Sequence, residues 1–374
     1  MLEHISVLLF CIFLLIQLFF YWIIYARFAF HKIKSKEYLE EEGVSVILCV
    51  KNEAHWLRRC LQPILEQNYS NYEVVVVNDN SEDGSNGILL EYQNKYPHLS
   101  VINISTNHVN VLEKKMSLAL GIKSAKHEII LITDVDTLPK SPNWIREMAK
   151  HYLDEHYVVL GYASYEQRNT FLNTLIRYDN VHEAILYFSH AIVGQPYRGV
   201  ARNLSYPKSL FLSNYNYILL YNSVHRDEDL FVNQIVTKKN TAVEYSIEAQ
   251  MISQQRHANL HEWLDFKRLS GSKGKCYKLK NQFLLGLYHS SGFFFYLSLI
   301  ASFVVLRNNS DYLLLLIALF SVRLLSQWFI FGKCILKLDE KALVRKVPLL
   351  DVFFMLVLPV LIINKIFYKK KKWK

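Results

Sequence analysis

Two aspartates separated by one residue, Asp134 and Asp136, give the strongest chemical signal in this 374-residue sequence. They lie in the segment Ile129 to Pro139, IILITDVDTLP, whose aliphatic start is typical of a strand buried on both faces. Carboxylates at the carboxyl end of such a strand lie where open α/β sheets bind ligands. Two hard oxygen ligands suit Mg²⁺ or Mn²⁺, which one or two carboxylates hold together with substrate phosphates. The plainer alternative is an acidic turn after a strand.

The elements that would position these aspartates form an alternating series of strands and helices. The apolar run Val44 to Val50 predicts the first strand, and apolar residues at helical spacing predict a helix over Ala54 to Gln67. The later elements are strands at 72–77, 99–104 and 129–133, and helices beginning at 88 and spanning 114–124. A strand-helix repeat of about 30 residues predicts a parallel, right-handed α/β sheet.

Polar side chains collect where these strands end. Asn52 and Glu53 follow the first strand, Asp79 follows the second, and Asp134 and Asp136 follow the fourth. Acids at one strand end are unremarkable, but three such ends in one sheet predict a polar crevice on one side. The sequence lacks the GxGxxG and GxxxxGK[ST] patterns, which disfavours a Rossmann dehydrogenase or a P-loop NTPase.

Composition places this α/β region between apolar ends. The chain is 51% hydrophobic with a net charge of +10, and its long apolar runs lie at the two ends. Residues 43–280 have ordinary globular composition, which is room for one large domain. Lysines cluster beside the apolar runs, including six of the last ten residues. This indicates membrane-surface charge, and no nucleic-acid-binding motif is present. The five cysteines show no metal-binding spacing.

Residues 1–30 predict a transmembrane anchor. The apolar run from Ile5 to Ala26 is long enough, at ~1.5 Å per residue, to cross a bilayer. It ends in aromatic residues followed by Arg27 and several lysines, so the positive-inside rule predicts a cytoplasmic middle domain. We therefore expect an integral protein of the cell (inner) membrane.

Residues 281–374 predict a C-terminal membrane region. Candidate helices span 283–306, 312–331 and 347–368, and a lysine-rich tail follows them. Arg323 in the second helix must face protein or extend to the interface. A crossing by the third would place the lysine tail outside, so this segment crosses, re-enters or lies in the interface.

Three segments in this order resemble family 2 glycosyltransferases of the GT-A fold. They are VSVILCVKNE, then LRRCLQPILEQNYSNYEVVVVNDNSEDGS, then KKMSLALGIKSAKHEIILITDVD. The resemblance covers roughly residues 43–280. It implies a GT-A domain, that is, a Rossmann-like α/β fold for nucleotide-diphospho-sugar transferases, with N- and C-terminal transmembrane helices.

The resemblance also implies roles for individual residues. Asp79 would contact the nucleotide base, and Asn52, Glu53 and Asp83 would lie near the donor. Lys115 would reach the nucleotide or its diphosphate. Asp134 and Asp136 form the DxD pair, with Asp136 the more direct ligand of Mg²⁺ or Mn²⁺. A diphosphate leaving group accumulates negative charge, which a divalent cation stabilises.

The second half of the resembling region carries the acceptor side. The segment GVARNLSYPK, Gly199 to Lys208, resembles the family's acceptor-side segment and makes Asn203 a candidate for substrate binding. Its Gly and Pro also fit a plain strand and turn, which is the alternative. The segment RDEDLFVN lies where the family places its catalytic base. Aligning its hydrophobic residue selects Asp227, and the literal Glu-Asp pair selects Asp229. Acids opening a helix also favour the helix dipole, so that alternative stays open. One base and no nucleophile imply inversion at the anomeric carbon.

Processive members of the family carry a QxxRW motif before their C-terminal helices. The nearest match here is Asp265 to Leu269, DFKRL, which keeps Arg268 but replaces the Gln and the Trp. Lys267 or Arg268 would contact the diphosphate. The departure disfavours a synthase that extrudes its own polymer.

These observations predict an inverting, metal-dependent glycosyltransferase. The expected donor is a UDP-, GDP- or dTDP-sugar, and the expected acceptor is a lipid-linked or envelope glycan at the cytoplasmic membrane face. The alternatives are a processive polysaccharide synthase coupled to export and a non-catalytic membrane scaffold with the same fold.

Overall fold

The computed structural model describes residues 2–33, 42–104, 114–154, 158–214, 227–271 and 277–355. The chain divides into two compact units, which are described separately. The sheet unit comprises residues 32–168 and 194–256, and the membrane-helix unit comprises residues 1–31, 169–193 and 257–374. These bounds differ from the predicted domain at 43–280, because helices α7 (Phe171–Ile192) and α11 (Leu260–Gly271) group with the membrane helices.

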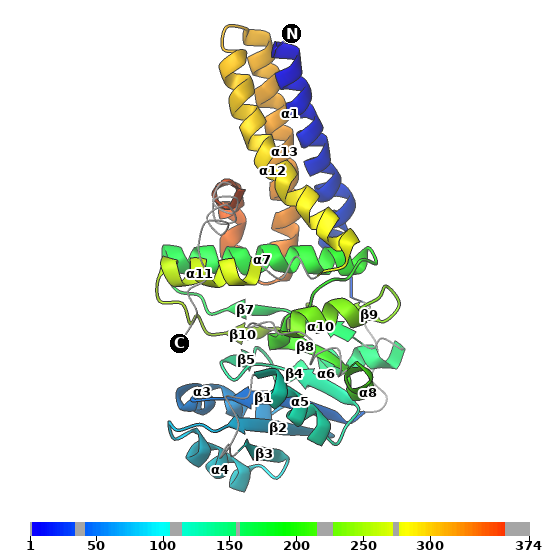
Figure 1. The fold of residues 1–374 in the computed structure, drawn as a ribbon, viewed down its shortest axis with the longest axis vertical. Coiled ribbons are helices and arrows are strands. Elements are labelled where there is room, and N and C mark those ends of the chain that lie inside the picture. The colour runs from blue at the N-terminus through cyan, green and yellow to red at the C-terminus, as the bar shows by residue number, and fades with distance from the viewer. Residues whose placement is uncertain are drawn as a thin grey trace. The chain divides into compact units, whose positions relative to one another are not determined.

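A seven-stranded sheet with the order β3-β2-β1-β4-β8-β6-β9 forms the centre of the sheet unit (Figure 1). Its strands are β1 (Val44–Val50), β2 (Tyr72–Asp79), β3 (Leu99–Ile104), β4 (Ile129–Ile132), β6 (Val158–Leu160), β8 (Leu204–Pro207) and β9 (Thr241–Val243). β1 to β4 pair in parallel, which confirms the predicted parallel sheet. β8 runs antiparallel to β4 and β6, a reversal that the strand-helix repeat did not predict.

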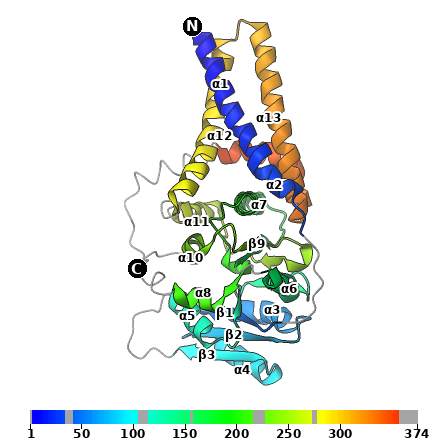
Figure 2. The same cartoon turned by 90° about the vertical axis from the view of Figure 1, so that its right-hand side faces the viewer.

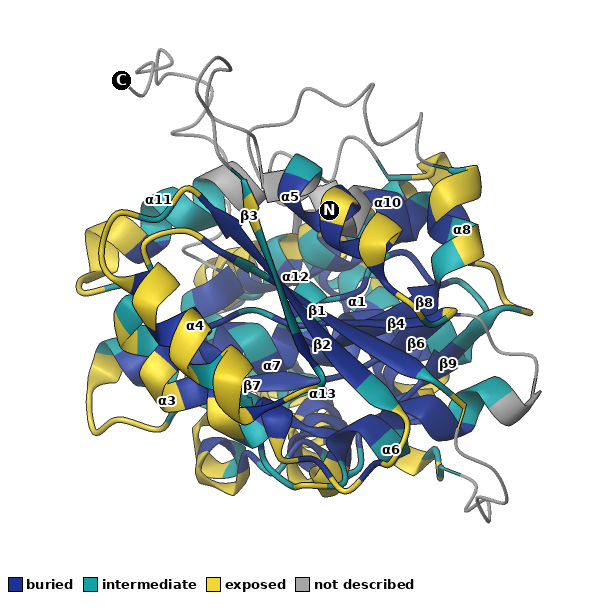
Figure 3. Ribbon diagram, turned by 90° about the horizontal axis from the view of Figure 1, so that it is seen from below, coloured by how far each residue is buried: buried dark blue, intermediate teal, exposed yellow. Residues whose placement is uncertain are grey.

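Helices cover this sheet because each has one apolar face. They are α3 (Ala54–Leu65), α4 (Ser85–Lys95), α5 (Lys114–Ser124), α6 (Trp144–Ala149), α8 (Lys208–Ser213) and α10 (Asp227–Ile235). Figure 3 shows β1, β2 and β4 buried along their lengths. α5 packs closely on the sheet at Gly121, where an added Cβ would lie 2.8 Å from Cγ2 of Ile47. Any larger residue at this position would push the helix away from β1.

A second sheet, with the order β5-β10-β7, follows β4 in the fold. It contains β5 (Thr137–Pro139), β7 (Ala163–Tyr165) and β10 (Met251–Ser253). β10 pairs antiparallel with β5 and parallel with β7. Since β5 begins directly after Asp136, this sheet holds the segment that follows the DxD pair in place.

Three helices in the membrane-helix unit are long and apolar enough to cross a membrane, within the residues that the structure describes. They span His4–Phe30, Leu279–Val305 (α12) and Ser310–Lys337 (α13). The first consists of α1 (Leu2–Phe19), a π-helical turn (Phe20–Tyr25) and α2 (Ala26–Phe30). The three helices run side by side in both views (Figures 1 and 2). This confirms apolar helices at both ends of the sequence.

Helix α7 lies across one end of these helices (Figures 1 and 2). The Phe188 ring packs 5.1 Å from the Phe28 ring, and the Arg177 guanidinium forms an ion pair with Glu340. These contacts explain why a helix from the middle of the sequence groups with the terminal segments.

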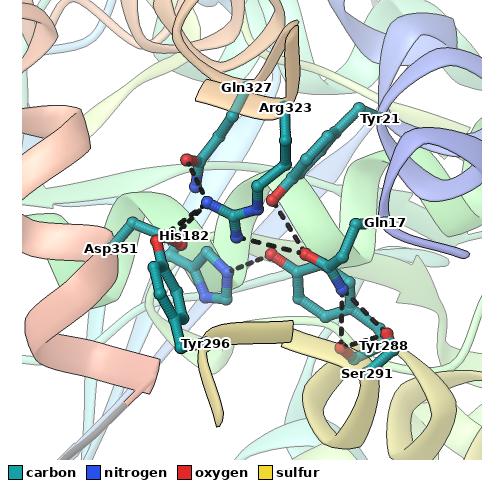
Figure 4. Close-up of polar contacts among 9 residues, drawn as sticks. All are labelled: Gln17, Tyr21, His182, Tyr288, Ser291, Tyr296, Arg323, Gln327 and Asp351. Carbon is teal, nitrogen blue, oxygen red and sulfur yellow. Dashed lines mark hydrogen bonds and ion pairs between the residues drawn. The ribbon is translucent and has the colours of Figure 1, made fainter. Parts of the chain in front are cut away.

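A buried polar cluster links the membrane helices (Figure 4). Arg323 on α13 is 0% exposed and forms a 2.9 Å ion pair with Asp351, on a helix over residues 347–355. Arg323 also donates to Tyr296 at 2.9 Å, Gln327 at 3.1 Å and Gln17 at 3.2 Å. Of the two placements that the sequence allowed for Arg323, the structure has the one that faces protein.

Candidate active site

The sheet unit has a topological switch point between β1 and β4. β2 and β3 extend the sheet on one side of β1, and β4 extends it on the other. The chain therefore leaves these two neighbouring strands in opposite directions, and open α/β sheets bind ligands at the carboxyl ends of such strands. Asn52 and Glu53 follow β1, and Asp134 and Asp136 follow β4. The structure thus brings together the residues predicted to line a polar crevice.

Asn52 fastens the loop after β1 to the loop after β2. Its backbone N–H donates to Oγ of Ser81 at 3.0 Å, and its Oδ1 accepts from the Glu82 N–H at 2.8 Å. Asn52 has φ +55°, a left-handed conformation that Asn adopts more readily than most residues. Its predicted role in substrate binding stays a prediction, while its role in the loop is visible here.

Asp83 caps helix α3 from outside that helix. Its Oδ2 accepts the N–H of Ala54 at 2.9 Å, and its Oδ1 accepts the Ser85 hydroxyl at 2.6 Å. Burial alone would raise the pKa of this carboxyl, but the hydrogen bonds from Ser85 and Ala54 together outweigh burial and lower it. Its predicted proximity to the donor stays a prediction.

Asp79 ends β2 and pairs with a lysine that the sequence did not single out. Its Oδ2 lies 3.0 Å from Nζ of Lys51, the first residue after β1. The Asp79 side chain is 9% exposed, whereas that of Lys51 is 46% exposed. The pair spans two adjacent strand ends and leaves the lysine accessible to solvent.

Arg256 bridges the acids at the switch point. Its Nε donates to Oδ2 of Asp136, and one terminal nitrogen donates to Oε1 of Glu53 at 2.8 Å. Burial raises the pKa of Glu53, and the Asp136 and Asp134 charges raise it further against the opposing Arg256. Burial alone would lower the pKa of Arg256, but Asp136 and Glu53 together raise it. One guanidinium therefore joins the ends of β1 and β4.

A second guanidinium, that of Arg202, lies near the same acids. Arg202 is 5% exposed, and its guanidinium carbon lies 4.6 Å from the centre of the Tyr165 ring. Burial lowers its pKa, but Tyr165 and the Asp134 and Asp136 carboxylates outweigh burial and raise it. Thr133 Oγ1 donates to the Arg202 carbonyl at 3.0 Å, which ties this residue to the end of β4.

Asn203 is a structural link in the core of the sheet unit. It is 0% exposed, accepts from Nε1 of Trp144 at 2.9 Å and donates to the carbonyls of Tyr162 and Ala249 at 2.9 and 2.8 Å. An added Cβ on Gly161 would lie 2.4 Å from the Asn203 side chain, so this close packing requires a glycine. Asn203 is fully buried in this structure, and its predicted contact with a substrate stays a prediction.

Comparison with known proteins identifies the family of this region. The family model described as Glycosyl transferase family 2 matches residues 45–208, which include both sides of the switch point. The chain carries a glycosyltransferase family 2 domain.

Curated relatives of this glycosyltransferase domain are distant. EpsH of Bacillus subtilis (strain 168), provisionally named a glycosyltransferase, is 25% identical over 195 residues, which cover 52% of this chain and 55% of EpsH. The poly-beta-1,6-N-acetyl-D-glucosamine synthase of Staphylococcus epidermidis is 27% identical over 129 residues, 32% of this chain and 30% of the synthase. The chain thus spans about half of the first relative and less of the second.

A solved structure shares the fold over most of the chain. The mannosyltransferase PcManGT from Pyrobaculum calidifontis, in complex with GDP-Man and Mn²⁺, aligns with a TM-score of 0.58 and 16% identity. The alignment covers 91% of this chain and 99% of PcManGT. The predicted GT-A architecture of the glycosyltransferase domain is therefore confirmed.

The residues predicted to act as the catalytic base lie in helix α10 of the sheet unit. Asp227 is its first residue and Asp229 its third, and the side chains of both fall outside the described part of the chain. The Lys115 side chain, in the first turn of α5, is also outside it. The roles of these three residues stay predictions.

Lys267 and Arg268 belong to α11 in the membrane-helix unit. Lys267 Nζ lies 2.8 Å from Asp179 and 2.9 Å from Glu183, both on α7. Arg268 lies 2.9 Å from Asp265 on its own helix. The two Lys267 ion pairs join α11 to α7, and the predicted contacts of Lys267 or Arg268 with a diphosphate stay predictions.

The DxD carboxylates have the chemistry that a divalent cation requires. Asp134 and Asp136 supply hard oxygen ligands, and no group of three or more His, Cys, Asp or Glu side chains is arranged for a metal in the described residues. Two carboxylates suffice for Mg²⁺ or Mn²⁺ when a diphosphate supplies further oxygens. Asp134 and Asp136 therefore fit a cation that binds together with the donor.

Sequence reasoning missed the basic residues of this site. Arg256 lies three residues after β10, in a stretch without regular structure, and no motif marks it as the QxxRW-like pattern marks Arg268. Arg202 adjoins the predicted Asn203, so the segment was noticed but not its charge. Lys51 directly follows the first strand, and its position was the signal available for finding it.

Proposed function

We propose that this protein is an inverting, metal-dependent glycosyltransferase. It transfers a sugar from a nucleotide-sugar donor to a lipid-linked or envelope-glycan acceptor at the cytoplasmic face of the inner membrane. The observation that carries the proposal is the switch point of the family 2 domain, where Glu53 after β1 and Asp136 after β4 meet on one guanidinium.

The donor is a nucleoside diphosphate sugar, and the site has groups suited to each part of it. In this proposal Asp79 binds the base, with Asn52, Glu53 and Asp83 nearby. Lys115 contacts the diphosphate, and so does Lys267 or Arg268. PcManGT was solved with GDP-Man and Mn²⁺, which supports a donor of this class and a divalent cation. UDP-, GDP- and dTDP-sugars are therefore all to be tested.

The reaction needs a base on the acceptor and charge stabilisation on the leaving group. Asp227 removes the proton from the acceptor hydroxyl, with Asp229 as the second candidate, and the hydroxyl oxygen then attacks the anomeric carbon. Asp134 and Asp136 would hold the divalent cation, which would supply positive charge beside the diphosphate leaving group. With a single displacement the configuration at the anomeric carbon inverts.

The membrane assignment rests on three helices. Within the described residues, His4–Phe30, α12 and α13 are long and apolar enough to cross a bilayer. Basic residues after the first helix favour a cytoplasmic catalytic domain by the positive-inside rule. A lipid-linked acceptor suits an enzyme anchored in this way.

Donor turnover by the purified, detergent-solubilised protein tests the proposal. UDP-, GDP- and dTDP-sugars would be supplied with Mn²⁺ or Mg²⁺ and membrane lipid extract, and nucleotide release measured with and without EDTA. We expect release from one donor, lost with EDTA. Asp136→Asn and Asp227→Asn should each lower it at least about a hundredfold.

Glu91→Gln is the matched control, because its side chain on α4 is 67% exposed. It should leave turnover unchanged. Turnover that is unaffected by EDTA and by Asp136→Asn would exclude the metal role. Donor binding without release from any donor would favour the non-catalytic scaffold.

A processive polysaccharide synthase is the second candidate, favoured by the similarity to the Staphylococcus epidermidis synthase. The length of the product distinguishes the two functions. Polymers made by the purified protein alone would establish the synthase, and addition of one sugar per acceptor would exclude it.

A further inference from the structure

We propose that Arg256 exchanges partners during donor binding: it neutralises Asp136 and Glu53 in the resting enzyme and moves to the donor's diphosphate when the cation takes Asp136. The inference rests on the proposed function and assigns to that site a residue that no sequence motif identified.

The first step is the position of the guanidinium. Arg256 Nε donates to Oδ2 of Asp136, whose other oxygen accepts from the Thr137 hydroxyl at 3.2 Å. Both oxygens of the predicted metal ligand therefore have protein donors. A cation that binds at Oδ2 would lie beside the guanidinium, and the two positive charges would repel each other.

The second step concerns which part of Arg256 is free to move. Gln254, two residues earlier, donates its backbone N–H to the Asp136 carbonyl at 3.0 Å, which fixes the main chain beside the site. The Arg256 side chain itself is 48% exposed, while Asp136 is 7% and Glu53 17% exposed. The carboxylates are buried in the protein, so in this proposal the half-exposed arginine side chain is the partner that changes position.

The third step concerns the diphosphate of the donor, to which the Arg256 guanidinium would move. A diphosphate carries anionic oxygens that the planar fork of a guanidinium binds in pairs. In this proposal the donor binds together with the cation. When the Arg256 guanidinium leaves the carboxylates, the anionic oxygens of the diphosphate are therefore close enough to bind it. Arg202, which is 5% exposed and packed on Tyr165, remains as the fixed positive charge.

Two substitutions separate the charge of Arg256 from its other properties. Arg256→Gln removes the charge, and Arg256→Lys keeps it. Binding of Mn²⁺ alone would be followed by the electron paramagnetic resonance signal of the free ion. We expect Arg256→Gln to bind Mn²⁺ about tenfold more tightly than the wild type, and Arg256→Lys to match the wild type, because only the first removes the competing charge.

Nucleoside diphosphates report the second half of the exchange. UDP, GDP and dTDP would each be titrated at saturating Mn²⁺ by calorimetry. For the nucleotide that binds, we expect Arg256→Gln to weaken binding about tenfold, since its contact with the diphosphate is lost. Arg168→Gln is the matched control, because that side chain is 43% exposed and pairs with Glu166; it should change neither affinity.

Opposite changes in the two affinities would establish the exchange. Equal Mn²⁺ affinity in the wild type and Arg256→Gln would overturn the competition, and equal nucleotide affinity would overturn the diphosphate contact. A failure of the proposed function looks different: no variant would bind Mn²⁺, with or without a nucleotide.

Discussion

Gln254 is a buried residue whose amide has no hydrogen-bond partner among the described residues. It is 1% exposed, and neither its Oε1 nor its Nε2 is bonded, although its backbone N–H is bonded to Asp136. An unsatisfied buried amide costs about 1–3 kcal/mol.

Gln254→Leu should therefore stabilise the protein. The change replaces an unpaired amide by an apolar group of similar size, and we expect a gain of about 1 kcal/mol, which raises Tm by about 2 °C. Thermal unfolding of the detergent-solubilised protein, followed by tryptophan fluorescence, measures this shift.

Gln250→Leu is the opposite control on the same chain segment. Gln250 is 0% exposed, but its amide donates to the Tyr245 carbonyl at 2.9 Å and accepts from Lys140 at 2.9 Å. Its replacement should lower Tm, because two polar groups lose their partner. A lower Tm for Gln254→Leu as well would show that its amide is satisfied in solution.

For single residues, the acidic side chains of the site could be predicted from the sequence, whereas the basic side chains could not. Asp134 and Asp136 follow an unmistakable strand, so their position at its end was readable from order alone. Arg256 meets them only because β10 lies beside β5, a pairing between residues far apart in the sequence. No local pattern encodes that contact.

Among the elements, the parallel strands were the most predictable. β1 and β3 have the bounds expected from their apolar runs, because strands buried on both faces carry a continuous signal. For the segment that contains β8 the sequence offered a strand-turn only as an alternative, since LSYP is short and its pairing with β4 depends on the whole sheet. The reversal of strand order at β1 is likewise a property of the sheet and not of any strand.

The helix over residues 347–355 is held to α13 by the ion pair between Asp351 and Arg323. Both side chains are buried, with exposures of 2% and 0%. Removal of one charge from a buried pair leaves the other charge buried without a partner, which lowers the free energy of unfolding by about 3 kcal/mol. Replacement of both residues by apolar ones is often neutral.

Arg323→Leu and Asp351→Leu should therefore each destabilise the protein, and the double variant should recover most of the loss. Unfolding of the detergent-solubilised variants, with a double-mutant cycle, measures the coupling. The control Asp311→Asn changes an exposed acid at the start of α13 and should have no effect. Additive losses in the double variant would contradict the pairing.

At the scale of the whole molecule, the sequence predicted the order of the parts but not their grouping. Apolar runs identified the terminal helices, and composition suggested one domain at 43–280. α7 carries buried polar residues such as Arg177 and His182 among its apolar ones, so composition gave no sign that it packs with the terminal helices. Contacts such as those with Phe28 and Glu340 assign it to the membrane-helix unit.

A fragment of residues 43–280 should therefore aggregate. It keeps α7 but lacks the partners of its apolar face: Phe188 packs 5.1 Å from Phe28, and Tyr178 packs 5.3 Å from Phe354. Both α7 side chains are at most 1% exposed in the full chain. Exposure of such a face creates a patch that associates with itself, so we expect size-exclusion chromatography to show large species.

The double substitution Tyr178→Ser and Phe188→Ser provides the matched test. In the fragment it should shift the elution towards a monomer, because the exposed patch becomes polar. In the full chain the same change should lower Tm, because there both rings are packed. If the unmodified fragment were already monomeric, α7 would not need the terminal helices. An improvement in the fragment together with a lower Tm in the full chain is expected only if α7 belongs to the membrane-helix unit. The two measurements together therefore test how the chain is divided.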